Sequence, residues 1–83
     1  MQIKEFKYHR GCSASVYPFD QTFTHITAEA HQQFGEEGMT YGINWPSIGS
    51  VPTDEARQFA AAINAACDWL EKKKEEVEST CKS

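Results

Sequence analysis

The sequence has few of the residues that mark metal-binding and disulfide-rich proteins. Its 83 residues include three cysteines, three histidines and three prolines. Cys12, Cys67 and Cys81 are odd in number and far apart, which argues against a disulfide framework and for reduced thiols. The spacing closest to a metal motif is His9-x-x-Cys12, but a tetrahedral zinc site needs four ligands. We therefore expect no structural metal and no cofactor.

Catalytic patterns are missing as well. There is no glycine-rich phosphate loop. Cys67 falls on the apolar stripe of a predicted helix, where a thiol is expected to be buried and inert rather than paired with a histidine. The carboxylates cluster in a turn, at a helix start and along a charged helix end, which are solvated positions. We expect a protein that is not an enzyme.

Long apolar runs and an excess of positive charge are absent too. Twelve acidic residues oppose eight basic ones, for a net charge of −4, and the acidic residues are spread along the chain. This charge disfavours a dedicated nucleic-acid binder. No run approaches the ~20 apolar residues of a membrane span, and the start Met1-Gln2-Ile3-Lys4-Glu5 does not read as a signal peptide. The expected location is the cytoplasm, and the expected organisation is one domain over residues 1–83.

The residues that are present predict an antiparallel hairpin. Residues 39–45 alternate between apolar and polar side chains, the period of a strand with one buried face. Residues 22–34 read as one long strand, with Ile26, Ala28 and Ala30 on the core face. Gly35 and Gly38 lie between the two strands and suit a tight connection. Two shorter strands are predicted at 2–9 and 13–17, with a bulge in the first because its apolar alternation is interrupted.

A long helix is predicted over residues 54–78, followed by a tail at 79–83. Thr53 is the expected N-cap, and Asp54 and Glu55 place negative charge in the first turn. Apolar residues recur every three or four positions, at Ala56, Phe59, Ala60, Ile63, Ala66, Cys67 and Leu70. A compact domain of this length has a radius of gyration of ~12 Å. Because such a helix is ~37 Å long, its charged end is expected to overhang or fray.

These elements predict an α+β fold. We expect a three- or four-stranded antiparallel sheet, with the C-terminal helix packed on one face. Phe59, Ile63 and Leu70 should contact Tyr41 and Ile43.

The uncharged connection after residue 45 is the first candidate for a binding surface. Trp45 and Ile48 could anchor a protein partner, as large apolar side chains do at interface centres. Trp45 could equally close the core over the start of the helix, and Trp69 could be a core, dimer or partner contact. Acidic residues would steer the approach of a basic partner surface, and the expected set is Glu36, Glu37, Asp54, Glu55, Glu71 and Glu75.

An alternative function is binding of nucleic acid at the first strand. Lys4, Lys7 and Arg10 alternate there with Phe6 and Tyr8, a combination that could neutralise and stack a single strand. The same pattern also suits an edge strand that discourages pairing. Symmetric self-association is a further alternative, because alanines nearly encircle the helix and small domains commonly form dimers.

The segment W-P-S-I-G-S-V-P-T-D-E-A-R-Q-F-A-A-A-I, from Trp45 to Ile63, with a hairpin before it, resembles small proteins encoded by bacteriophages and prophages. These include anti-CRISPR proteins and other inhibitors of bacterial defence. The resemblance implies a short sheet with one alanine-rich helix. It also implies that the chain inhibits a bacterial host protein, such as a nucleic-acid-handling complex, by occluding it rather than by catalysis.

Overall fold

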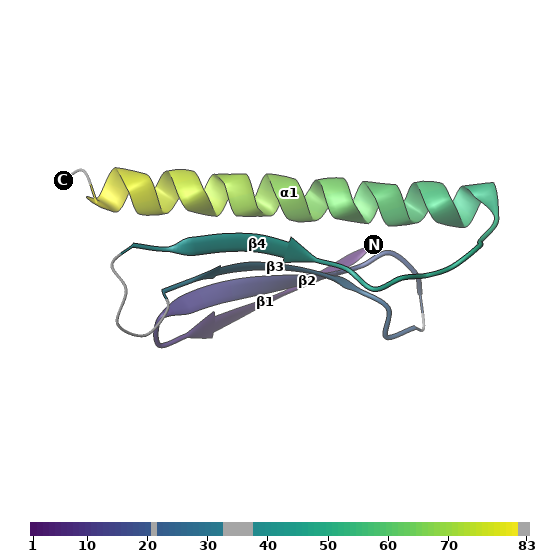
Figure 1. Ribbon diagram of the computed structural model, residues 1–83, viewed down its shortest axis with the longest axis horizontal. Helices are drawn as coiled ribbons and strands as arrows, with labels where there is room; N and C mark the ends of the chain where they lie inside the picture. The colour runs from purple at the N-terminus through teal and green to yellow at the C-terminus, as the bar shows by residue number, and fades with distance from the viewer. Residues whose placement is uncertain (21, 33–37, 82–83) are drawn as a thin grey trace.

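The chain forms a four-stranded sheet with one long helix lying along it (Figure 1). The computed structural model describes residues 1–20, 22–32 and 38–81, with side chains as far as residue 76. The strands are β1 (Gln2–Tyr8), β2 (Gly11–Tyr17), β3 (Ile26–His31) and β4 (Thr40–Asn44), and the helix is α1 (Thr53–Cys81). The strands pair in the order β1-β2-β3-β4, each antiparallel to the next. The predicted α+β fold is confirmed, with four strands.

The largest boundary error concerns the predicted strand at 22–34. Strand β3 covers only Ile26–His31, and residues 22–25 form a connection without strand pairing. In this connection the His25 Nδ1 atom lies 2.8 Å from the carbonyl oxygen of Phe23. A local side-chain contact of this kind competes with the ladder of a strand. Residues 33 and 34 lie outside the described residues.

Strand β1 is one residue shorter and more regular than predicted, and β2 is two residues longer. All seven residues of β1 pair in one register with β2, from Gln2 opposite Tyr17 to Tyr8 opposite Gly11, so the predicted bulge is wrong. Strand β2 begins at Gly11, two residues earlier than predicted, because His9 and Arg10 alone form the turn. The interrupted alternation has a simple cause, since Ile3 and Phe6 lie on opposite faces of one edge strand.

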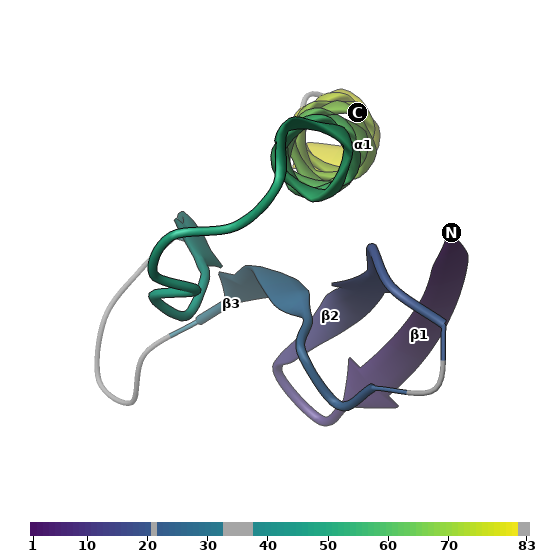
Figure 2. The ribbon, with the colours of Figure 1, turned by 90° about the vertical axis from the view of Figure 1, so that its right-hand side faces the viewer.

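The core lies between α1 and the two central strands. Figure 2, which views the molecule end-on, shows the helix above the middle of the sheet. The buried apolar side chains of the sheet are Ala14, Val16, Ile26, Ala28 and Ala30, and those of the helix are Phe59, Ala62, Ala66 and Leu70. Most of these side chains are small, so the helix can approach β2 and β3 closely. Phe19 extends the core from the connection after β2, where its ring stacks on Phe59 with centroids 6.5 Å apart.

The predicted apolar stripe of the helix is rotated by part of a turn from the observed one. Ala62 is fully buried, whereas Ala56 and Ala60 are exposed and Cys67 is only half-buried. The expectation of a buried Cys67 is therefore wrong. The prediction placed the helix on Tyr41 and Ile43, but it lies mainly over β2 and β3 and only in part over β4. Those two side chains pack at the margin of the core, as does Ile63.

The molecule is elongated rather than compact. Its radius of gyration is 14.3 Å and its dimensions are 47 × 22 × 18 Å. The helix continues past the predicted end at residue 78. It therefore spans 29 residues and is ~43 Å long. It runs back along the full length of the strands, antiparallel to β4 (Figure 1). Within the described residues, α1 is not apolar enough to cross a membrane.

Candidate functional site

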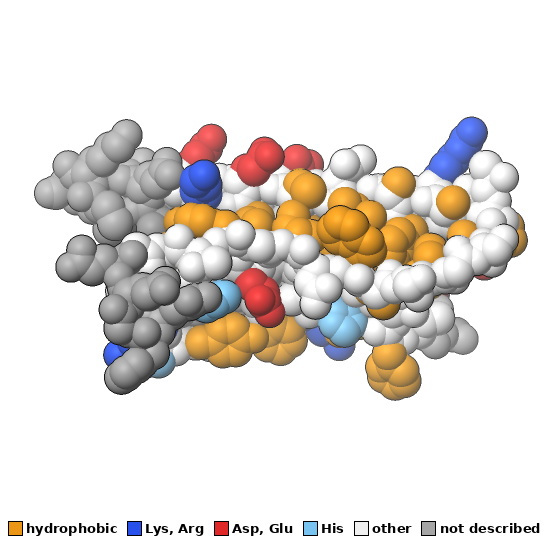
Figure 3. Space-filling model, viewed as in Figure 1, with side chains coloured by type: hydrophobic (Ala, Val, Ile, Leu, Met, Phe, Trp, Pro, Cys, Tyr) orange, Lys and Arg blue, Asp and Glu red, His pale blue; other side chains and the backbone are white. Residues whose placement is uncertain are grey.

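An apolar surface follows the line where α1 meets β4. In Figure 3 it is a band of hydrophobic side chains between the helix and the sheet, with acidic side chains along the upper edge of the helix. We call this surface the seam. Its members are all half-buried or exposed, and they are Tyr41, Ile43, Trp45 and Ile48 on the sheet side and Ala56, Ala60, Ile63 and Cys67 on α1. The seam thus brings together residues of the predicted core and residues of the uncharged connection.

Helical periodicity explains why four residues of α1 reach the seam. Ala56, Ala60, Ile63 and Cys67 are spaced by three or four residues, which places them on one side of the helix. This side faces β4, because the Nζ atom of Lys74, seven residues after Cys67, lies 5.7 Å from the centroid of the Tyr41 ring.

The other side of the helix faces β1. There Trp69 Nε1 donates a hydrogen bond of 2.5 Å to Glu5 Oε1. Trp69 is half-buried, and the Nζ atom of Lys73 lies 5.7 Å from the centroid of its ring. Trp69 is therefore remote from the seam, and its contact ties the helix to the edge of the sheet.

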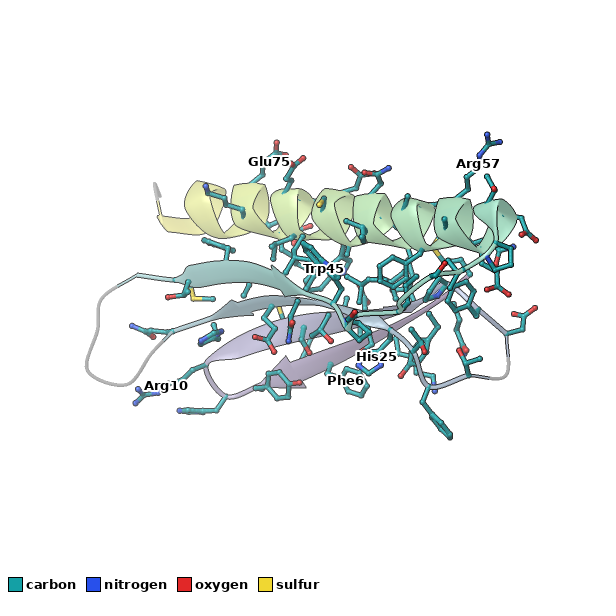
Figure 4. All side chains as sticks on the ribbon, turned by 45° about the vertical axis from the view of Figure 1, so that its right-hand side comes forward. Phe6, Arg10, His25, Trp45, Arg57 and Glu75 are labelled. Atoms are coloured by element: carbon teal, nitrogen blue, oxygen red, sulfur yellow. The ribbon has the colours of Figure 1, made fainter. Side chains whose placement is uncertain are left out.

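Trp45 is the large exposed side chain of the seam. It follows the last residue of β4 and is 52% exposed. Figure 4 shows it on the helix side of the sheet, whereas His25 and Phe6 lie on the other side. Trp45 also borders an open groove of about 500 Å³ that contains no Asp, Glu, Lys or Arg and is lined by Phe23, Thr24, His25, Thr27, Asn44, Trp45 and Pro46. Trp45 thus contributes to the seam and to the groove.

Phe23 is the residue of this site that sequence reasoning missed. It is 92% exposed at the groove, the largest exposure among the large apolar side chains described. The sequence did place Phe23 on the polar face of the predicted strand, together with His25 and Thr27, which could have indicated its exposure. A phenylalanine on a face without a covering element is exposed, but the sequence did not reveal which face the helix covers.

The other predicted partner-binding residues fall in separate places. Ile48 is half-buried and packs against the core, so only part of its side chain is available to a partner. Asp54 and Glu55 are exposed in the first turn of α1. Glu71 follows Cys67 by one helical turn, beside the seam, and Glu75 points away from the sheet (Figure 4). Glu36 and Glu37 lie outside the described residues.

The basic and aromatic residues of β1 are divided between the two faces of the sheet. Lys4, Phe6 and Tyr8 share the face opposite α1, which we call the open face, whereas Lys7 points to the helix side. On the open face the Nζ atom of Lys4 lies 5.3 Å from the centroid of the Tyr17 ring. The Tyr8 hydroxyl lies 2.8 Å from Ser13 Oγ, within hydrogen-bond distance. The open face therefore combines rings with one lysine rather than with a basic cluster.

Comparisons with models of known protein families, with curated proteins and with solved structures found no match. In the part of the chain that the structure describes, no group of three or more His, Cys, Asp or Glu residues is placed to hold a metal ion.

Proposed function

We propose that the protein is a non-catalytic binding module that recognises another protein through the seam. The observation that carries this proposal is the continuous apolar surface between α1 and β4, which no other element of the described residues covers. Centres of protein interfaces are depleted in charged residues and enriched in aromatic ones, and their rims are polar. The seam has this arrangement, with Trp45 and Tyr41 inside it and Glu71 at its border.

Trp45 is the central anchor of this interface. A tryptophan that is half exposed beside an uncharged groove can bury its remaining surface against a partner. Phe23, across the groove, would enlarge the buried area. Exposed alanines at positions 56 and 60 allow a partner backbone or a large side chain to approach the helix closely.

The resemblance to phage-encoded inhibitors suggests that this binding inhibits the partner. Occupation of the seam by a bacterial protein would block that protein's own contacts, which is inhibition without catalysis. The exposed acids of α1, among them Glu71 and Glu75, would speed the approach of a basic partner surface. A host protein that handles nucleic acid presents such a surface.

Site-specific photocross-linking tests the seam with a matched control. Ala60 and Ala61 are adjacent, exposed alanines, but only Ala60 lies on the seam. A photoreactive phenylalanine analogue at position 60 should cross-link one defined protein in a bacterial lysate, and the same analogue at position 61 should not. Equal products from both positions, or none from position 60, would refute the proposal.

Binding kinetics with the purified partner then separate the roles of the residues. Trp45→Ala should raise the dissociation rate at least about tenfold, because an anchor residue acts after docking. Glu71→Lys should mainly slow association and reduce its dependence on salt. Arg57→Ala, on the side of the helix away from the sheet (Figure 4), is the control and should change neither rate.

A second candidate function is binding of single-stranded nucleic acid on the open face. The specific observation is that Lys4, Phe6 and Tyr8 lie together and exposed on that face. Bases could stack on the rings while the lysine contacts a phosphate. A labelled oligothymidine should then bind with an affinity that falls with salt and is lost in Phe6→Ala, whereas Trp45→Ala should not affect it.

A further inference from the structure

Strand β1 is an edge of the sheet that no other element of the described residues covers. All seven of its residues are exposed, and α1 packs against β2, β3 and β4 but meets β1 through the Trp69 side chain. Natural edge strands are usually short, bulged or interrupted by proline. The opposite edge, β4, has five residues with Gly42 at its centre, and Pro46 follows it. Strand β1 is long, unbulged and free of proline, and its charged side chains Lys4, Glu5 and Lys7 are its only such protection.

At alternate residues of β1, the backbone N–H and C=O groups point away from the sheet and can pair with another strand. Tyr8 and Gly11 flank the two-residue turn, so their backbone groups face each other as in a β-turn. Alternation along an antiparallel ladder then directs the N–H and C=O groups of Gln2, Lys4 and Phe6 towards β2. Those of Ile3, Glu5 and Lys7 point away from the sheet. These outward groups can form a second ladder.

We infer that β1 pairs antiparallel with β1 of a second copy of this chain, about a two-fold axis at Phe6. A two-fold axis between antiparallel strands is perpendicular to the sheet, so one residue lies opposite its own copy. With Phe6 at the axis, Glu5 lies opposite the partner's Lys7 on the helix side of the sheet. On the open face, Lys4 lies opposite the partner's Tyr8, a pair that suits a cation–π contact.

Charge favours the register with its axis at Phe6 over the registers with the axis at a nearby residue of β1. An axis at Lys4 or at Lys7 places two lysines against each other, and an axis at Glu5 places two carboxylates together. Like charges directly opposite each other destabilise a strand pair, whereas opposite charges stabilise it. Only the axis at Phe6 opposes Glu5 and Lys7 twice with no like-charge pair. Glu5 can serve both its contacts, because Oε1 accepts from Trp69 and Oε2 stays available for the partner's Lys7.

The resulting dimer is an eight-stranded sheet with both helices on one face. Phe6 and the partner's Phe6 form a non-hydrogen-bonded pair, the kind with Cα atoms only ~4.5 Å apart and side chains in contact. The seam lies at β4, the far edge of each subunit, so it stays accessible in the dimer. The inference therefore does not depend on the proposed function.

Sedimentation velocity over a concentration series, from about 10 µM to about 1 mM, tests the pairing, because an interface this small gives a weak dimer. The parent protein should pass from monomer to dimer in this range. Lys7→Glu should weaken the dimer at least about tenfold, since two attractive pairs become repulsive. Glu5→Lys combined with Lys7→Glu should restore the affinity to within about threefold. A parent that stays monomeric, or a dimer indifferent to the single change, would overturn the inference.

Cysteine cross-linking tests the register independently. Phe6→Cys should form a disulfide-linked dimer on mild oxidation, because residues at the axis meet within disulfide reach. Lys4→Cys is the matched control on the same face, and it should not cross-link beyond the level of the parent, since its copy lies ~13 Å away along the strands. Cross-linking of both variants to the same extent, or of Lys4→Cys alone, would contradict the axis at Phe6. Circular dichroism of each variant shows that the fold is kept.

Discussion

Strands β3 and β1 are six and seven residues long and lie in one sheet, but their surroundings differ. Strand β3 is covered by α1 and buries Ile26, Ala28 and Ala30 completely. Strand β1 buries no residue, although Ile3 and Glu5 point to the same side of the sheet as the helix. The difference therefore does not follow from side-chain direction alone.

The width of one helix explains the contrast. An α-helix with its side chains is ~10 Å across, and neighbouring strands are ~4.8 Å apart, so one helix covers two to three of the four strands. Here it covers β2 and β3 and part of β4. Each edge of the sheet keeps apolar side chains that the helix leaves partly or wholly exposed, at the seam on one side and on β1 on the other. A sheet with a single helix thus carries two candidate interfaces as a consequence of its geometry.

The largest expected effect comes from the same substitution in the two strands. Ile26→Ala should lower the free energy of unfolding by roughly 2 to 5 kcal/mol, because this side chain is fully buried and its loss leaves a cavity. Ile3→Ala should cost under about 0.5 kcal/mol in the monomer, because Ile3 is 47% exposed. Urea denaturation measures both at a concentration where the chain is monomeric. Similar losses at the two positions would show that β1 belongs to the core.

Two glycines extend the comparison to the backbone. A Cβ atom at Gly11 would lie 2.4 Å from the carbonyl oxygen of Ala30 and 2.7 Å from the Cα atom of His31, whereas one at Gly42 would meet no atom within 4 Å. Gly11→Ala should therefore destabilise the protein by roughly 1 to 3 kcal/mol, as overpacking does. Gly42→Ala should be neutral or stabilise by up to about 1 kcal/mol, because it reduces the freedom of the unfolded chain. Thermal unfolding of the two variants compares them directly, and equal shifts would contradict the close approach at Gly11.

Most of the fold follows from the residues themselves. The alternation at residues 39–45 and the pattern Ile26-Ala28-Ala30 identified the hairpin and its buried face, and the caps at Thr53 to Glu55 marked the helix start to within one residue. The helix face was predicted less well. An alanine contributes little to an apolar stripe whether it is buried or exposed, so the sequence could not distinguish Ala62 from Ala60.

The candidate site was predictable only in part. Trp45 was recognisable because a tryptophan in an uncharged connection has few roles, and its exposure agrees with a binding surface. The seam was not recognisable, because it depends on how far across the sheet the helix lies. The position of the helix across the sheet results from the packing of small side chains on β2 and β3. The residue pattern of a single helix or strand contains no information on this packing.

A smaller effect is expected from the contact that links β1 to β2 on the open face. Tyr8→Phe removes the hydroxyl that lies 2.8 Å from Ser13 Oγ, and Ser13 is only 4% exposed. The loss should be about 1 kcal/mol, the usual net value of such a hydrogen bond. Tyr17→Phe is the control on the same face, since the described residues offer its hydroxyl no hydrogen-bond partner, and it should change stability by less than about 0.5 kcal/mol. Chemical denaturation resolves the two, and equal losses would mean that the Tyr8 hydroxyl is solvated.

The smallest expected effect is at Trp45, the residue on which the proposed function depends most. Trp45 and Ile48 lie three residues apart in one connection, but Ile48 packs against the core and Trp45 is 52% exposed. Ile48→Ala should therefore lower the free energy of unfolding by about 1 to 2 kcal/mol, in proportion to its partial burial. Trp45→Ala should lower it by less than about 0.5 kcal/mol, as surface substitutions do. If Trp45→Ala proves the more costly of the two, the indole closes the core over the helix and is not available as an anchor. If it is nearly neutral, the indole is not required for stability, and the cross-linking and kinetic experiments can then assign its role to the partner.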